Sequence, residues 1–166
     1  MHTFIKILKP LSFLPAIAMM IIIYAFSAQS GEVSGALSYE ISYDIVEVKD
    51  EIMHTGYSPT ELARQARGIH HYVRKAAHVT EYLILAICVA FPLYVYGIRG
   101  FFLFFFTCAF CVTFAGFDEY HQSFVGGRGP SPKDVAIDSI GIFTGSLLVE
   151  TFCYCVLHNP GRERVR

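Results

Sequence analysis

Four ionisable side chains stand together where residues 74–86, RKAAHVTEYLILA, enter a long apolar stretch. Arg74 and Lys75 could hold an anion, and His78 with Glu81 could accept and donate protons. A charged group one turn inside a membrane-spanning helix costs up to ~3 kcal/mol unless a partner or water offsets it. What these residues can do therefore depends on which other polar groups the fold brings to them.

The composition indicates a membrane protein. The chain has 166 residues, of which 54% are hydrophobic and only 16% are charged, too apolar for an ordinary soluble domain. The length allows one domain over residues 1–166. A net charge of −1 and the lack of a basic patch argue against nucleic-acid binding. The five cysteines lie in apolar runs, so we expect buried apolar side chains, no metal site and no cofactor.

Four apolar segments have about the 20 residues that a membrane-spanning helix needs. They predict an all-α fold, a four-helix transmembrane bundle, with spans at 11–27, 77–96, 100–117 and 135–156. The basic residues near both termini favour a cytoplasmic N-terminus and a cytoplasmic C-terminus. The short turn 97–100, GIRG, makes the second and third spans antiparallel neighbours.

The long segment 28–73 between the first two spans is expected to be helical as well. An apolar residue recurs every three or four positions, which is the pattern of an amphipathic helix, at Leu37, Ile41, Ile45, Val48 and Ile52. The sequence Ser58-Pro59-Thr60-Glu61 predicts a second helix start, because it has a capping residue, a proline and an acid in their favoured places. That helix could run into the second span, and both could lie on the membrane surface.

Spans that run up and down bring the ends of the first and third to the same face as the starts of the second and fourth. With cytoplasmic termini this is the extracytoplasmic face. The polar residues of the sequence gather at these four places. We predict a ligand-binding site there from Gln29, Arg74, Lys75, His78, Glu81, Glu119, Gln122, Arg128, Asp134 and Asp138.

Two interpretations of this polar face are open. The charges could simply pair and close the bundle, or they could line a binding or catalytic site, as ionisable groups in membrane spans often do. The candidates for a catalytic role are the residues that can exchange protons, His78, Glu81, Asp118, Glu119 and Asp138. Tyr82 and Tyr120 fit an interfacial aromatic belt. Gly141 and Gly145 could pack the fourth span within its own bundle or against a second copy.

These residues resemble the VanZ-like family of bacterial integral membrane proteins. The resemblance is carried by FSAQS (26–30), RKAAHVTEY (74–82), DEYHQSFVGGRGPSPKD (118–134) and VAIDSIGIFTG (135–145). It implies a multi-pass protein of the bacterial plasma membrane, in a family linked to resistance to the lipid-tailed glycopeptide teicoplanin, with no accepted reaction. The shared pattern falls on Lys75, His78, Glu81, Asp118, Glu119, Gln122, Arg128, Asp134 and Asp138.

Three functions fit this sequence. The first is binding or modification of an amphiphilic envelope molecule, such as a membrane lipid, a lipoglycopeptide or a lipid-linked cell-wall precursor. The second is an intramembrane hydrolase or transferase that works by acid–base chemistry or through a divalent metal, although neither HExxH nor GxSxG occurs. The third is a transporter or structural partner, which could act as an oligomer.

Overall fold

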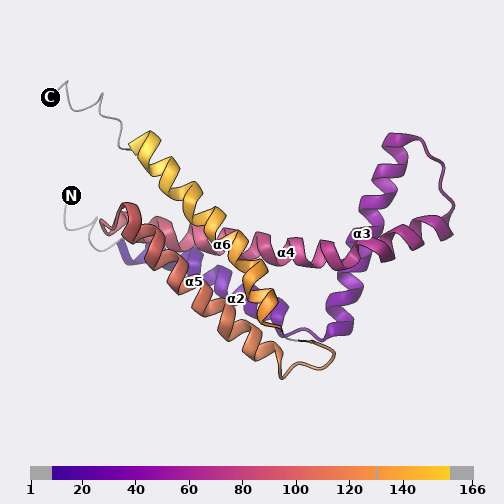
Figure 1. The fold of residues 1–166 in the computed structure, drawn as a ribbon, viewed down its shortest axis with the longest axis horizontal. Coiled ribbons are helices and arrows are strands. Elements are labelled where there is room, and N and C mark those ends of the chain that lie inside the picture. The colour runs from indigo at the N-terminus through magenta and orange to yellow at the C-terminus, as the bar shows by residue number, and fades with distance from the viewer. Residues whose placement is uncertain (1–8, 130, 158–166) are drawn as a thin grey trace.

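The computed structural model describes residues 9–129 and 131–157, and all regular elements among them are helical (Figure 1). In chain order they are the 3-10 turn η1 (Lys9–Phe13), α2 (Leu14–Ser27), α3 (Gly31–Met53), α4 (Pro59–Val95), α5 (Gly100–Gln122), α6 (Pro132–Phe152) and the π turn η2 (Cys153–Leu157). Figure 1 shows α2, α5 and α6 gathered along one half of α4, while α3 crosses the other half.

The predicted all-α fold with four spans is confirmed. Four helical segments are long and apolar enough to cross a membrane, and each overlaps one predicted span: Lys9–Ser27, Pro59–Val95, Gly100–Gln122 and Pro132–Val156. The predicted turn between the second and third spans is also present. Gly97, with a φ of +98°, reverses the chain there, a conformation that glycine adopts without a steric penalty.

The second span is the C-terminal half of α4, which is a much longer helix. At 37 residues α4 is about 55 Å long, whereas the hydrocarbon core of a bilayer is about 30 Å thick. Its start is the predicted one, since the Ser58 side chain accepts a hydrogen bond from Glu61 N at 3.3 Å and Pro59 stands in the first turn. The N-terminal half of α4 therefore extends beyond the span and offers a surface to α3.

The turn that joins α3 to α4 is fixed by one carboxylate. Asp50 Oδ1 accepts hydrogen bonds from the Thr55 hydroxyl and, at 3.0 Å, from Tyr57 N. The bond from Thr55 and the backbone bond from Tyr57 both hold the pKa of the Asp50 carboxyl below its ordinary value. This turn keeps the two helices folded back on each other.

The helices α4 and α6 pack backbone against backbone. A Cβ at Gly141 would stand 2.1 Å from Val79 O, and one at Gly145 would stand 2.5 Å from Leu83 O. Gly141 and Gly145 therefore pack the fourth span within its own bundle, which is one of the two roles predicted for them. Around the contact lie buried Tyr82, Leu85 and Ile142, which make up the core with residues of α2 and α5.

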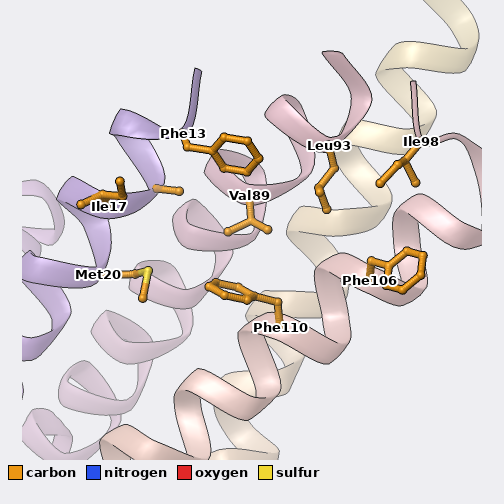
Figure 2. Close-up of a pocket in the computed structure, with 9 residues that line it drawn as sticks. Phe13, Ile17, Met20, Val89, Leu93, Ile98, Phe106 and Phe110 are labelled. Atoms are coloured by element: carbon orange, nitrogen blue, oxygen red, sulfur yellow. The ribbon is translucent and has the colours of Figure 1, made fainter. Parts of the chain in front are cut away.

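The cavity nearest to η1 is apolar. It has a volume of about 420 Å³ and lies between α2, α4 and α5, and its lining is almost wholly hydrocarbon, including Phe13, Met20, Val89 and Phe110 (Figure 2). The lining of this cavity therefore offers no polar groups for catalysis or for binding a charged ligand. The five cysteines are free, and Cys155 is exposed rather than buried as the sequence predicted.

We expect Gly141→Ala to destabilise the protein, because the added methyl would meet the backbone of α4 and force the two helices apart. Overpacking of this kind costs about 1–3 kcal/mol, which lowers the Tm by about 2–4 °C per kcal/mol in a chain of this size. Thermal unfolding in detergent measures the change. Gly116→Ala in α5 is the matched control, since nothing lies within 4 Å of its Cβ position. An unchanged Tm for Gly141→Ala would contradict the close contact.

Candidate functional site

The polar residues that the sequence singled out meet at the opposite end of the bundle from η1. The middle of α4 is tied to the start of α6 by an ion pair, with Lys75 Nζ 2.5 Å from Asp134 Oδ2. The loop between α5 and α6 is tied to the end of α2 by Arg128, which donates to Phe26 O at 3.0 Å and to Gln29 O at 3.1 Å. Segments separated by about a hundred residues are therefore in direct contact.

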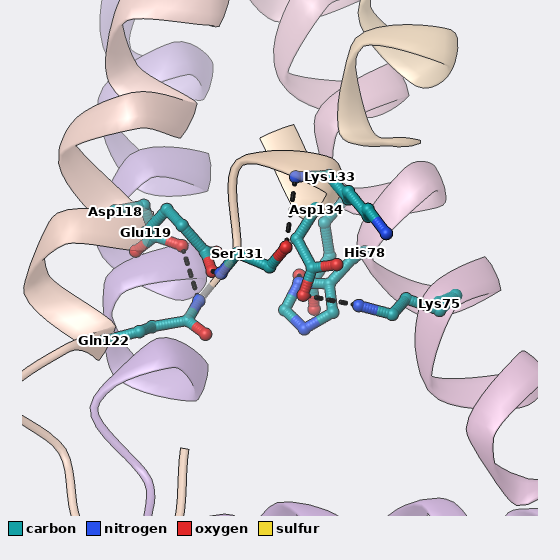
Figure 3. A network of polar contacts seen from close by, with 9 residues as sticks. Lys75, His78, Asp118, Glu119, Gln122, Ser131, Lys133 and Asp134 are labelled. Atoms are coloured by element: carbon teal, nitrogen blue, oxygen red, sulfur yellow. Dashed lines mark hydrogen bonds and ion pairs between the residues drawn. The ribbon is translucent and has the colours of Figure 1, made fainter. Parts of the chain in front are cut away.

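Some of these residues form a closed cluster, by which we mean Lys75, His78, Glu119, Gln122, Asp134 and Asp138 (Figure 3). The space that they enclose is about 10 Å³, which is at most the size of one water. Glu119 Oε1 accepts a hydrogen bond from Ser131 N at 2.5 Å, so this acid holds the start of α6. Gln122 Nε2 donates to Asp118 Oδ2 at 3.0 Å within α5. For this cluster, the structure agrees with the first interpretation, in which the charges pair and close the bundle.

The remaining predicted residues line an open pocket of about 200 Å³ between α3, α4 and the end of α2. Its polar side chains are Gln29, Arg74, His78, Glu81 and Arg128, with Ser34 and Ser38 of α3. Its apolar side chains include Phe26, Leu37, Ile41 and Val73. The predicted site is thus divided in two, and His78 is the only residue that lines both parts.

The open pocket has an excess of positive charge, since it contains two guanidinium groups and one carboxylate, that of Glu81. Burial lowers the pKa of Arg128, and the neighbouring charge of Arg74 lowers it further. Arg74 itself is half-buried and has no ion pair within 4.0 Å among residues 9–129 and 131–157. Its neighbour Lys75, by contrast, is neutralised by Asp134.

His78 stands beside Glu81, with Nδ1 at 3.4 Å from Glu81 Oε2. Because Asp138 lines the closed cluster with His78, the imidazole lies between a carboxylate of α4 and one of α6. An imidazole held in this way can transfer protons. Asp118, Glu119 and Asp138 do not line the open pocket, so only His78 and Glu81 of the catalytic candidates can reach a molecule bound there.

Unpartnered polar atoms also gather at this end. Among the described residues, six buried side-chain atoms lack a hydrogen-bond partner, and five of them belong to Ser27, Glu81, Tyr82, Asp118 and His121. Buried polar atoms in proteins almost always have a hydrogen-bond partner, so this group of exceptions at one end of the bundle is unusual. Tyr82 is fully buried, so its predicted place in the interfacial belt is wrong, whereas Tyr120 is 66% exposed.

Sequence reasoning missed the contributions of α3 and of Ser131. The α3 residues of the pocket are apolar or small, and nothing in their types marks them as part of a site. Ser131 precedes a proline at the start of α6 and could have been recognised as a capping residue. No group of three or more His, Cys, Asp or Glu side chains in the described part of the chain is arranged to hold a metal ion.

Comparison with known proteins gives the family. A family model described as VanZ/LLP1 matches residues 12–153. The chain belongs to this family. No curated protein and no solved structure matched it in the corresponding searches. Together with its four apolar helices, this makes the protein a VanZ-type multi-pass membrane protein.

In this VanZ-like protein the residues of the shared pattern do not all have the same environment. Most belong to the closed cluster or bond to it: Lys75, Asp118, Glu119, Gln122, Asp134 and Asp138. Glu81 and Arg128 line the open pocket, and His78 lines both. Part of the pattern is therefore explained by packing and part is available to a ligand.

We expect the Lys75–Asp134 pair to couple α4 to α6 energetically. Lys75→Met and Asp134→Asn should each lower the free energy of unfolding by about 1–3 kcal/mol, because each leaves a partly buried charge unpaired. The double variant should lose clearly less than the sum of the two, as measured by unfolding in detergent. The exposed Glu61–Arg64 pair on α4 is the control, with an expected coupling below about 0.5 kcal/mol. Equal couplings for the two pairs would show that Lys75–Asp134 has no special role.

Proposed function

We propose that this VanZ-like protein binds an amphiphilic cell-envelope molecule, holding the anionic head group of that molecule in the open pocket. The observation that carries the proposal is the pair Arg74 and Arg128, which line the pocket against a single carboxylate, with Arg74 unpaired among the described residues. Guanidinium groups bind phosphate and carboxylate through paired hydrogen bonds. The same pocket has apolar walls, as an amphiphile needs.

Arg128 is suited to be the fixed half of this anion site. Its two hydrogen bonds to the carbonyl groups of Phe26 and Gln29 hold the guanidinium in place. A guanidinium has five N–H groups, so three remain for other partners. A donor that is already held in position loses little conformational entropy when it binds.

The size of the pocket favours a head group over a whole ligand. At about 200 Å³ it is smaller than the roughly 300–1,000 Å³ of sites that enclose a drug-sized molecule. Phe26, which is 41% exposed at the end of α2, lies at the edge towards the lipid-facing side of the spans. A phosphate or carboxylate would occupy the pocket while an acyl or polyprenyl tail stays in lipid.

The membrane side on which this happens is part of the proposal. The basic residues at both termini favour cytoplasmic ends, which puts the open pocket on the outer face of a bacterial plasma membrane. Lipid-linked cell-wall precursors and lipid-tailed glycopeptides are both anionic amphiphiles found there. Retention of such a molecule would explain a link to teicoplanin resistance.

We expect Arg74→Gln to weaken binding of a long-chain polyprenyl phosphate or of teicoplanin by at least about tenfold, since a hydrogen bond to a charged group contributes about 1.5–3 kcal/mol. Binding is measured on the purified protein in lipid nanodiscs. Arg67→Gln is the matched control, because Arg67 lies on α4, is exposed and does not line the pocket. In cells, Arg74→Gln should reduce protection against teicoplanin more than Arg67→Gln does. Equal affinities for the two variants would overturn the anion site.

A second candidate is an enzyme acting on the same molecules, and the observation in its favour is the contact between His78 and Glu81 inside the pocket. This pair could act as the acid and base in hydrolysis or transfer of a lipid-linked phosphate group. Such an activity would use the anion site to hold its substrate.

For a binding protein we expect His78→Gln to change the affinity for polyprenyl phosphate by less than about threefold, because the head group is held by arginines. The same preparations are assayed for release of phosphate from polyprenyl pyrophosphate. Release by the wild-type protein that disappears in His78→Gln, with binding retained, would establish the enzyme instead. Arg67→Gln again serves as the control.

A further inference from the structure

The apolar side chains of α3 form a stripe that no part of the described chain covers. We call it the α3 stripe and define it as Leu37, Ile41, Ile45, Val48 and Ile52. Their exposed fractions run from 42% at Leu37 to 73% at Ile52. At about 100° per residue, these five positions fall on one side of the helix. A continuous apolar surface of this kind marks an interaction site.

The α3 stripe is separate from the face by which α3 packs on α4. The buried residues of α3 are Ser38, Ser42 and Val46, and the serine hydroxyls bond to backbone carbonyls of their own helix. On a third side α3 carries the acidic residues Glu32, Glu40, Glu47 and Glu51, and Asp44 lies where this side borders the α3 stripe. The helix thus has a packing face, an apolar stripe and an acidic face.

The α3 stripe faces the spans. Leu37 and Ile41 line the open pocket together with Phe26 at the end of α2 and Glu81 of α4. Figure 1 shows α3 lying across α4, transverse to the spans, beside the end of α2. A side of α3 that faces the spans also faces the lipid around them.

The direction of α3 is fixed at its N-terminus. Only residues 28–30 separate it from α2. Gly31 N donates to Gly126 O at 3.0 Å, and a Cβ at Gly31 would stand 1.9 Å from Gly127 O. Since α3 is held here and along α4, the α3 stripe cannot turn away from the membrane without breaking these contacts.

We infer that α3 is an interfacial helix, with the α3 stripe embedded in the surface of the same leaflet that surrounds the open pocket. Lipid is the expected occupant because the stripe continues the lipid-facing surface of α2, where Ile22 is 45% and Phe26 is 41% exposed. Interfacial helices bury their apolar face roughly 5–10 Å into the head-group region. The acidic face is left in water, so the attachment depends on apolar contact and not on attraction to anionic lipid.

One consequence concerns access to the open pocket, and it rests on the proposed function. With the α3 stripe in the leaflet, Leu37 and Ile41 form the side of the open pocket that borders the head-group layer. A head group then enters sideways from the leaflet, and its tail never leaves lipid.

The chain contains no tryptophan, so a single introduced tryptophan reports on one position. We expect the fluorescence of Ile45→Trp, in phosphatidylcholine vesicles, to be quenched by brominated acyl chains about threefold more strongly than that of Glu47→Trp, given the shallow burial of an interfacial face. These positions are two residues apart and point in nearly opposite directions, about 200° around the helix. Val48→Trp repeats the test on the α3 stripe, and iodide should quench Glu47→Trp preferentially.

Two outcomes would overturn the inference. If Ile45→Trp and Val48→Trp are quenched by iodide as strongly as Glu47→Trp, the α3 stripe lies in water. If they are shielded from both quenchers, another protein surface covers it. The proposed function fails separately: lipid quenching of the α3 stripe combined with equal ligand affinities for Arg74→Gln and Arg67→Gln would leave the interfacial helix standing and remove the anion site.

Discussion

The direct backbone contact between α4 and α6 is the constraint on which the polar end of this protein depends. Gly141 and Gly145 have no Cβ, so α6 approaches Val79 and Leu83 more closely than side chains would allow. One to two turns further along, the same approach brings Asp134 against Lys75 and Asp138 beside His78. Charged groups near lipid are stabilised by such proximity, because an unpaired charge there is costly. The small residues of α6 and the acids that precede them are thus parts of one arrangement.

The polar residues at this end form two groups, which differ in whether their charges are paired. In the closed cluster the lysine faces a carboxylate, and Glu119 and Gln122 have partners of their own. In the open pocket two guanidinium groups are close enough for the charge of one to lower the pKa of the other. A bundle that needed only to be held shut would require the first group alone. The second group supports a binding role for the same end of the molecule.

The fold followed from the sequence because hydropathy identifies spans and short turns dictate their order. That order alone was enough to predict that the polar segments would meet. Helix geometry puts Arg74 and Lys75 about 100° apart, but the sequence does not show which neighbouring helix each of them faces, so the division of the site could not be predicted. Lys75 meets α6 and Arg74 lines a pocket with α3. The burial of Ser38 and Ser42 in place of the apolar residues of α3 was equally unpredictable, because periodicity does not say which face meets protein and which meets lipid.

The two arginines of the open pocket differ in a way that suits an anion of variable structure. Arg128 is immobilised by two carbonyl groups of the α2 terminus, so its charge has a fixed position. Arg74 stands on the long helix with no ion pair in the described part of the chain, so its side chain can adjust to what is bound. In the proposed anion site, the fixed donor would set where the anion lies, and the adaptable one would accommodate phosphate or carboxylate. Lys75 cannot serve as the adaptable donor, because its ammonium group is already paired with Asp134.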